Sequence, residues 1–341
     1  MQLIKFIKSK TNLPEKSIQN TVELLNEDCT IPFISRYRKE RTGNLDEVAI
    51  GDIVAFKTQF EELIKRKSTI LKALEEQGVL TSETQQKIDI TDNLTTLEDI
   101  YLPFKKKRKT KAETARKNGL EPLAKIIMSQ KATDIDSIAS KYLNSDIISE
   151  EDALEGARYI IAEWINERTD IRNNIRWQLE RHAIISTKGV KSKITDEKAQ
   201  KFRDYFDWSE ALNSCPSHRL LAILRAEKEG FIRVKIEIDK EYALEKIESR
   251  IIRSNNACSK QVELAVQDSY KRLLYPALSN EILSNSKEKA DETAIDVFAK
   301  NLKQLLLGAP LGEKNILGID PGFRSGCKIV CLNAQGDLKH N

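Results

Sequence analysis

The stretch DEVAIGDIVAFKTQFEELIKRKSTILKALEEQG, residues 46–78, decides the fold of this chain. Its apolar residues return at steps of three and four, the spacing of one buried face on an α-helix. They are Ile53, Phe56, Phe60, Leu63, Ile64, Ile70, Leu71 and Leu74. Asn44, Asp46 and Glu47 favour a helix start and Gly78 favours its end, so we expect one helix of roughly 45 Å that acts as a strut.

The composition predicts the same structural class for the rest of the 341 residues. Gly (13) and Pro (8) are scarce, so turns are few and helices should dominate. Hydrophobic residues make up 40% of the chain and charged residues 32%, which allows real cores beneath a heavily charged surface. The length is sufficient for two or three domains.

Two stretches depart from helical spacing. FIRVKIEID alternates apolar with charged residues, which predicts a half-buried strand near 231–238. ILGIDPG (316–322) and GCKIVCLN (326–333) predict two further short strands, which follow a break made by Gly308, Pro310 and Gly312. The expected fold is mainly α: a multi-helix N-terminal region with the strut helix, a small strand-containing inset, and the start of an α/β domain.

Positive charge is concentrated in YLPFKKKRKTKAETARKNG, residues 101–119. Eight cations face one acid, Glu113, so the local net charge is +7 while the whole chain carries +4. The cations are Lys105, Lys106, Lys107, Arg108, Lys109, Lys111, Arg116 and Lys117. Pro103 should end the preceding helix, and Thr110 with Glu113 predicts a capping box for a new helix that ends at Gly119. Such cations can follow a phosphate backbone, and a solvated charged turn is the alternative.

A second group of cations lies in IPFISRYRKER, residues 31–41, which we expect to form one helix. Thr30 and Pro32 favour its start and Gly43 its end. Its positive residues are Arg36, Arg38, Lys39 and Arg41, and they alternate with Phe33, Ile34 and Tyr37. Helical spacing would bring Arg38 close to Arg41 and place Ile34 and Tyr37 on another face. These cations either bind nucleic acid or form the basic outer face of an ordinary amphipathic helix.

The cysteines and histidines predict neither a metal site nor a disulfide framework. The five cysteines are scattered with no C-x-x-C pair, only three histidines exist, and no cofactor is expected. This usage suits a reducing cytoplasm, where we expect the protein to reside. The N-terminal MQLIKFIKSK has too short an apolar stretch for a signal peptide, and no run approaches the roughly 18 apolar residues of a membrane span.

Four stretches in sequence order resemble the Tex family of bacterial transcription accessory proteins. They are IPFISRYRKERTGNLDE (31–47), LEDIYLPFKKKRKTKAETARKNGLEPLA (97–124), SHRLLAILRAEKEGFIRVKIE (217–237) and ILGIDPGFRSGCKIVCL (316–332). The resemblance implies a Tex-like N-terminal helical domain over 1–195, a central helical region over 196–312, and a truncated start of a YqgF (ribonuclease-H-like) domain over 313–341. It also implies nucleic-acid binding and a role in transcription.

The chain departs from the family pattern at its end. It stops after about two strands of the YqgF domain, and the helix-hairpin-helix modules and S1-type OB-fold that the resemblance implies are absent. Asp320 matches the family's first-strand aspartate, but the other acidic positions would lie beyond Asn341. Asp320 is therefore a metal candidate only in a longer protein, since two-metal chemistry needs several carboxylates. We expect no catalytic residue and no enzyme activity in this chain.

Three functions are consistent with the sequence. The favoured one is nucleic-acid binding, to RNA or DNA, within a transcription accessory factor. The alternative is a helical scaffold that docks on RNA polymerase or other transcription machinery, and the third is a metal-dependent nuclease. Phosphate contacts give a steep dependence of affinity on salt, which separates the first function from the second. Divalent-metal dependence of strand cleavage would indicate the third.

Overall fold

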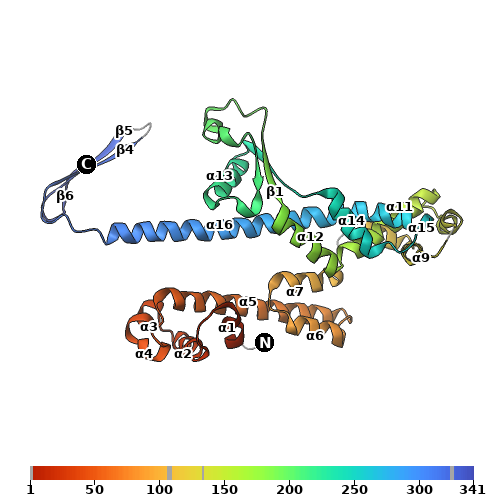
Figure 1. Cartoon of the computed structure of the whole chain (residues 1–341), viewed down its shortest axis with the longest axis horizontal. Coiled ribbons are helices and arrows are strands. Elements are labelled where there is room, and N and C mark those ends of the chain that lie inside the picture. The colour runs from red at the N-terminus through yellow and green to blue at the C-terminus, as the bar shows by residue number, and fades with distance from the viewer. Residues whose placement is uncertain (1–2, 106–109, 133, 323–325) are drawn as a thin grey trace. The chain divides into compact units, whose positions relative to one another are not determined.

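The computed structural model describes residues 3–105, 110–132, 134–322 and 326–341, and it is mainly helical as expected (Figure 1). The chain forms two compact units. The first combines Met1–Ala183 with Glu237–Ile282, and the second combines Ile184–Ile236 with Leu283–Asn341. The division of the chain at 195 and 312 stays a prediction.

The strut helix is present as α5, Glu47–Glu76. Asp46 is its N-cap and accepts a hydrogen bond from the Ala49 N–H at 2.8 Å, in agreement with the predicted start. Its buried apolar residues are Ile50, Ile53, Leu63, Ile70 and Leu74, whereas Ile64 is 40% exposed and lies off the predicted stripe. The helices that pack against α5 include α1 (Leu3–Lys10), α2 (Glu15–Asn26) and α3 (Ile31–Tyr37) (Figure 1).

The prediction of one helix over 31–41 is wrong in one respect, because the structure has two helices there. α3 stops at Tyr37, α4 covers Lys39–Thr42, and Arg38 between them has φ −128° and ψ 22°. The break lets α4 turn onto α2, where Thr42 is fully buried. α4 ends at Gly43 with φ +71°, and a Cβ atom there would lie 2.7 Å from the Ser17 hydroxyl oxygen, so this turn requires glycine.

Two short helices follow α5. They are α6 (Ser82–Ile90) and α7 (Leu94–Tyr101). Thr81 caps α6, because its side chain accepts the hydrogen bond from the Thr84 N–H. Pro103 ends α7 as predicted and lies within a single 3₁₀ turn, Leu102–Phe104.

The rest of the first unit is built around α11, Glu150–Asn166. It begins with the predicted capping box of Ser149 and Asp152, and it packs against α8, α9 and α15. Its fully buried residues are Ala157, Ile160, Ile161, Ala162 and Ile165. The other helices of this part are α8 (Lys111–Lys117), α9 (Glu121–Ser129), α10 (Ile135–Ala139), α12 (Thr169–His182), α14 (Lys240–Ile251) and α15 (Ala257–Asp268).

The second unit contains a three-stranded sheet in the order β2-β1-β3, with α13 (Ser217–Lys228) before its last strand. β3, Ile232–Glu237, confirms the predicted inset strand, and Ile232 and Ile236 are buried while Arg233 and Lys235 are exposed. β1 (Ile184–Gly189) and β2 (Asp207–Ala211) pair antiparallel and were not predicted. Thr187 on β1 is 1% exposed and donates to the Tyr205 carbonyl, so polar residues interrupt the apolar alternation in this strand.

The chain continues through α16, Tyr275–Leu306, which Figure 1 shows as one unbroken helix. After it come the two predicted strands, β4 (Ile316–Gly322) and β5 (Gly326–Leu332), and a third, β6 (Leu338–His340). They form an antiparallel sheet in sequence order, with Ile319 opposite Ile329. Leu317 and Ile319 on one face are 62% and 58% exposed, Val330 on the other face is 37% exposed, and none of the described residues of this sheet is buried. None of the described helices is both long enough and apolar enough to cross a membrane.

The contrast in burial predicts a contrast in local stability. Backbone amides of β4 and β5 should exchange with solvent at least about 100-fold faster than those of Ile53–Leu74, because opening an uncovered hairpin exposes little additional apolar surface. Hydrogen–deuterium exchange of the monomer, followed by mass spectrometry, measures this ratio. Equal protection of the two segments would mean that β4 and β5 are covered in solution.

Candidate nucleic-acid interface

The basic segment, defined as residues 101–119, lies between α7 and α9. Lys105 follows the 3₁₀ turn and is exposed, whereas the predicted Lys106, Lys107, Arg108 and Lys109 lie outside the described residues. α8 begins as predicted, since the Thr110 hydroxyl accepts the Glu113 N–H at 3.1 Å. That hydroxyl also donates to Glu163 on α11 at 2.9 Å, so the start of α8 is tied to the core.

Arg116 is a predicted cation that the fold uses for an ion pair. Its guanidinium donates to the Glu163 carboxylate at 2.9 Å, and the Glu163 side chain is only 7% exposed. Thr110 and Arg116 therefore share one buried acid, which holds both ends of α8 against α11. Lys117, one residue further, is exposed and has no ion pair among the residues that the structure describes. The segment thus combines an anchored end with free positive charge.

Lys111 is exposed but has an aromatic partner. Its Nζ donates to the Tyr159 hydroxyl at 2.8 Å and lies 4.4 Å from the centre of that ring. The hydrogen bond that Lys111 donates to Tyr159 raises the pKa of Lys111, so this side chain stays positive. Arg272 lies 5.3 Å from the same ring, and Asp268 neutralises it. The Tyr159 ring therefore fixes the position of Lys111 without cancelling its charge.

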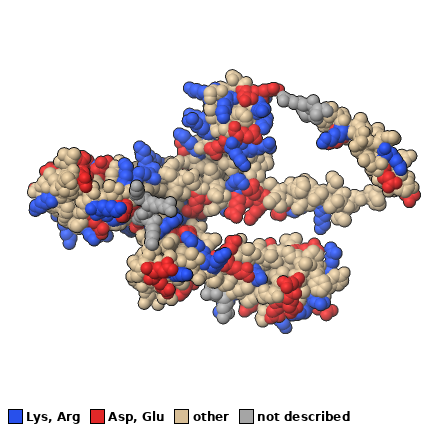
Figure 2. Space-filling model, turned by 180° about the vertical axis from the view of Figure 1, so that it is seen from behind, with Lys and Arg blue, Asp and Glu red and all other residues tan. Residues whose placement is uncertain are grey.

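The second predicted group lies around the break between α3 and α4. Arg36 is 3.7 Å from Glu47, and Arg41 is 3.6 Å from Glu23, but every side chain in these pairs is about half exposed or more. Exposed pairs of this length contribute little, so both arginines keep most of their capacity to bind anions. Arg38 and Lys39 form no ion pair with any other residue in the described part of the chain. Figure 2 shows that positive and negative side chains are mixed over the visible surface, so these cation groups are local patches.

Two family models match this chain. The Tex-like protein N-terminal domain matches residues 1–75, and the Tex central region-like domain matches residues 130–298. The chain is 37% identical over 336 residues to the uncharacterized protein YdcI of Bacillus subtilis (strain 168), and the match covers 97% of the chain. It is 37% identical over 345 residues to the transcriptional accessory protein Tex of Neisseria gonorrhoeae, with 99% covered.

The chain belongs to the Tex family. It spans about half the length of these curated relatives, 47% of the Bacillus protein and 45% of the Neisseria protein. A more distant relative is the human S1 RNA-binding domain-containing protein 1, at 27% identity over 99% of this chain and 35% of that protein. The N-terminal Tex match includes Arg36, Arg38, Lys39 and Arg41, whereas the basic segment lies between the two matched regions.

A buried charge cluster in this Tex-family chain was missed from the sequence. Arg172 and Arg176 lie on α12, and their side chains are only 9% and 12% exposed. Arg172 donates to Asp99 on α7 at 2.6 Å, and Arg176 donates to Asp99 at 2.9 Å and to Glu281 on α16 at 2.6 Å.

Arg172 and Arg176 connect α12 to the acidic residues of α7 and α16. Burial by itself lowers the pKa of Arg176, but the hydrogen bond to Glu281 and the negative charge of Asp99 outweigh this effect and raise it. The i, i+4 spacing of the two arginines was a usable signal for a shared face. The acidic partners could not be predicted from the sequence, because Asp99 and Glu281 are 73 or more residues away from the arginines that they contact.

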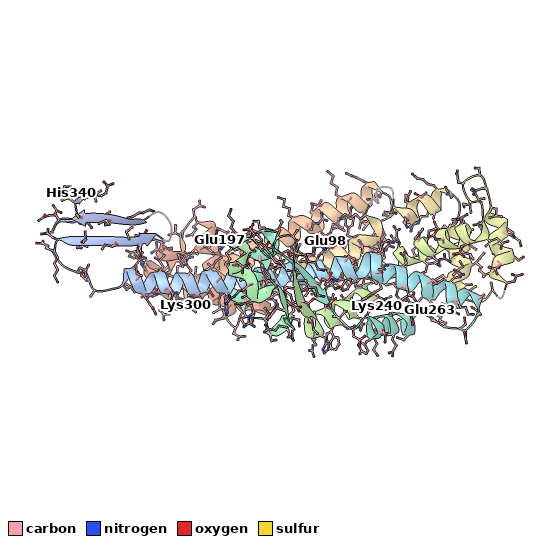
Figure 3. The ribbon with its side chains drawn as sticks, turned by 90° about the horizontal axis from the view of Figure 1, so that it is seen from above. Glu98, Glu197, Lys240, Glu263, Lys300 and His340 are labelled. Atoms are coloured by element: carbon pink, nitrogen blue, oxygen red, sulfur yellow. The ribbon has the colours of Figure 1, made fainter. Side chains whose placement is uncertain are left out.

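Replacement of Asp99 by alanine should destabilise the first unit by about 3–5 kcal/mol, because it leaves two buried guanidinium groups without their shared carboxylate. Glu98 provides a matched control on the same helix, labelled in Figure 3. Its pair with Arg66 is about 40% exposed, so Glu98→Gln should change the free energy of unfolding by less than about 1 kcal/mol. Urea unfolding followed by circular dichroism gives both values, and equal losses would contradict a special role for Asp99.

Proposed function

We propose that this chain binds nucleic acid, RNA in particular, through phosphate contacts as part of a transcription accessory protein. The observation that supports the proposal is the +7 net charge of the basic segment. Its helix α8 is held in place by buried contacts to Glu163. Such charge is unfavourable by self-repulsion unless a polyanion or solvent compensates it. The names of two relatives, a transcriptional accessory protein and an S1 RNA-binding domain-containing protein, support this choice of ligand.

Anchoring makes the segment suited to a phosphate backbone. α8 is held to α11 at both ends, so Lys111 and Lys117 are presented from a fixed helix. Lysine and arginine contacts to phosphate release counterions, and each contact contributes about 0.7 to the salt slope for a single strand and about 0.9 for a duplex. The expected binding is therefore independent of sequence and strongly dependent on salt.

Neutralising Lys105, Lys106, Lys107, Arg108 and Lys109 to Gln should reduce the slope of log affinity against log salt by up to about 3.5 for single-stranded RNA, because up to five phosphate contacts are lost. Fluorescence anisotropy titrations at several salt concentrations measure the slope. The fold should be retained, because these changes remove charge without removing a core residue.

The matched control removes the same charge from scattered exposed positions, which are Lys65, Lys72, Lys87, Lys125 and Lys141. It should change the slope much less, since these residues do not form one continuous patch. An unchanged affinity and slope in the Lys105–Lys109 variant would refute the proposed function.

A second candidate function is protein docking, and one observation favours it. The second half of α16 carries exposed apolar side chains. Phe298 is 66% exposed, and Leu305 and Leu306 are 80% and 74% exposed. Apolar surface of this kind marks interaction sites. Docking on RNA polymerase or another transcription component through this surface would depend little on salt, in contrast to phosphate binding.

We further propose that the chain binds nucleic acid without cleaving it. Asp320 is exposed at the end of β4, and the described residues contain no group of three or more metal-ligating side chains. A lone carboxylate binds Mg²⁺ weakly, because that ion gives up its waters reluctantly. Incubation of labelled RNA or DNA with Mg²⁺ or Mn²⁺ should give no cleavage, and Asp320→Ala should change nothing. Cleavage that this substitution abolishes would overturn the proposal.

A further inference from the structure

An exposed aromatic ring lies at the break between α3 and α4, within a basic surface. Ile34 is fully buried, whereas Tyr37, expected on the same face, is 68% exposed. The break at Arg38 ends α3 directly after Tyr37, so no following helical turn covers the ring. Tyr37 and Phe33 lie 5.4 Å apart between ring centres, tilted by 41°. An exposed tyrosine supported by a second ring offers a rigid, flat apolar face.

The same residues line an open hollow of about 550 Å³, formed by Arg36, Tyr37, Arg38, Lys39, Glu40 and Arg41. Four of these lining residues are cations, and Glu40 is the only acid among the six. The volume lies within the roughly 300–1,000 Å³ of small-ligand sites, and the lining combines one aromatic face with several positive groups. This combination favours a ligand that is both planar and anionic.

The positive charge around Tyr37 is available to a ligand. The Arg38 guanidinium lies 5.0 Å from the centre of the Phe33 ring, which orients it without neutralising it. Neither Arg38 nor Lys39 is paired with an acid among the described residues, and the contacts of Arg36 and Arg41 with acids are 3.6 Å or longer. A phosphate entering this surface therefore displaces no strong ion pair.

We propose that this surface binds an unpaired base of a single-stranded nucleic acid. The base stacks on Tyr37, while Arg38 and Lys39 hold the adjacent phosphates. A duplex cannot use the site in this way, because its base faces are covered by their neighbours. Stacking on aromatic side chains accepts any base, since every base has a π-face. The inference rests on the proposed function and adds to it that the preferred ligand is single-stranded.

Tyr37→Ala tests the stacking directly. The probes are uridine and thymidine oligomers of about 15 nucleotides and a blunt duplex of the same length. Loss of the ring should weaken binding of both single strands by about 5- to 150-fold and leave duplex binding within about twofold. Tyr37→Phe keeps the ring and should bind like the unaltered protein. Both variants should melt at the unaltered temperature, because Tyr37 lies largely in solvent.

Matched controls separate stacking from general effects of exposed residues. Tyr242 on α14 is 42% exposed, so Tyr242→Ala removes another exposed tyrosine ring and should leave single-strand affinity unchanged. Arg38→Gln should lower the salt slope by about 0.7 for a single strand. Arg203→Gln, at a side chain that is 75% exposed, should not lower it. Cross-linking of a 5-bromouridine oligomer and peptide mapping should label residues 33–41.

The outcomes distinguish this inference from the proposed function. Strong salt-dependent binding that Tyr37→Ala does not alter would overturn the stacking site and leave nucleic-acid binding in place. Equal losses in Tyr37→Phe and Tyr37→Ala would also overturn stacking, because the hydroxyl and not the ring would then contribute the affinity. Displacement of the oligomer by a polyglutamate peptide but not by free uridine nucleotide would show that the surface recognises acidic protein instead. If the unaltered chain binds no nucleic acid at low salt, both proposals fail together.

Discussion

The first unit depends on one buried carboxylate, Asp99, between two arginines of α12. The three side chains lie in a region where an unpaired charge would be costly, and each satisfies the hydrogen-bonding groups of another. Glu281 extends the cluster to α16, so three helices from distant parts of the sequence meet at the same charges. An apolar contact could hold these helices together equally well, but it would fix their register less strictly, since hydrogen bonds to a guanidinium require defined directions.

The same chemistry divides the cations of this chain into two groups. Arg116, Arg172 and Arg176 are held by buried acids and maintain the fold. Lys105, Lys111, Lys117, Arg38 and Lys39 have no acid partner among the described residues. Because Arg116 lies within the basic segment and is nevertheless fixed by Glu163, local charge density alone does not distinguish the two roles. Burial of the acidic partner distinguishes the two roles, as the buried carboxylates of Glu163 and Asp99 illustrate.

The break at Arg38 relates local structure to the proposed ligand. Tyr37 lies one turn after Ile34 at the end of α3, yet Ile34 is buried and Tyr37 is exposed between cations. The break at Arg38 turns the chain toward α2, where Thr42 is buried. Gly43 makes the turn possible, because it adopts a positive φ and leaves room for Ser17. The exposed ring therefore lies next to a turn that the packing of α4 fixes.

The sequence by itself determined the elements whose signals are local. The spacing of Ile53, Leu63, Ile70 and Leu74 predicted α5, the alternation around Ile232–Ile236 predicted β3, and Thr110 and Ser149 marked helix starts, because such patterns act within a few residues. Tertiary structure alone decided the break at Arg38, the strands β1 and β2, and the burial of Arg172 and Arg176. Each depends on partners distant in the chain: α2 for α4, β1 for β2, and Asp99 for the arginines. Local periodicity carries no information about such partners, so the exposed tyrosine and the fixed arginines could be recognised only after the chain was folded.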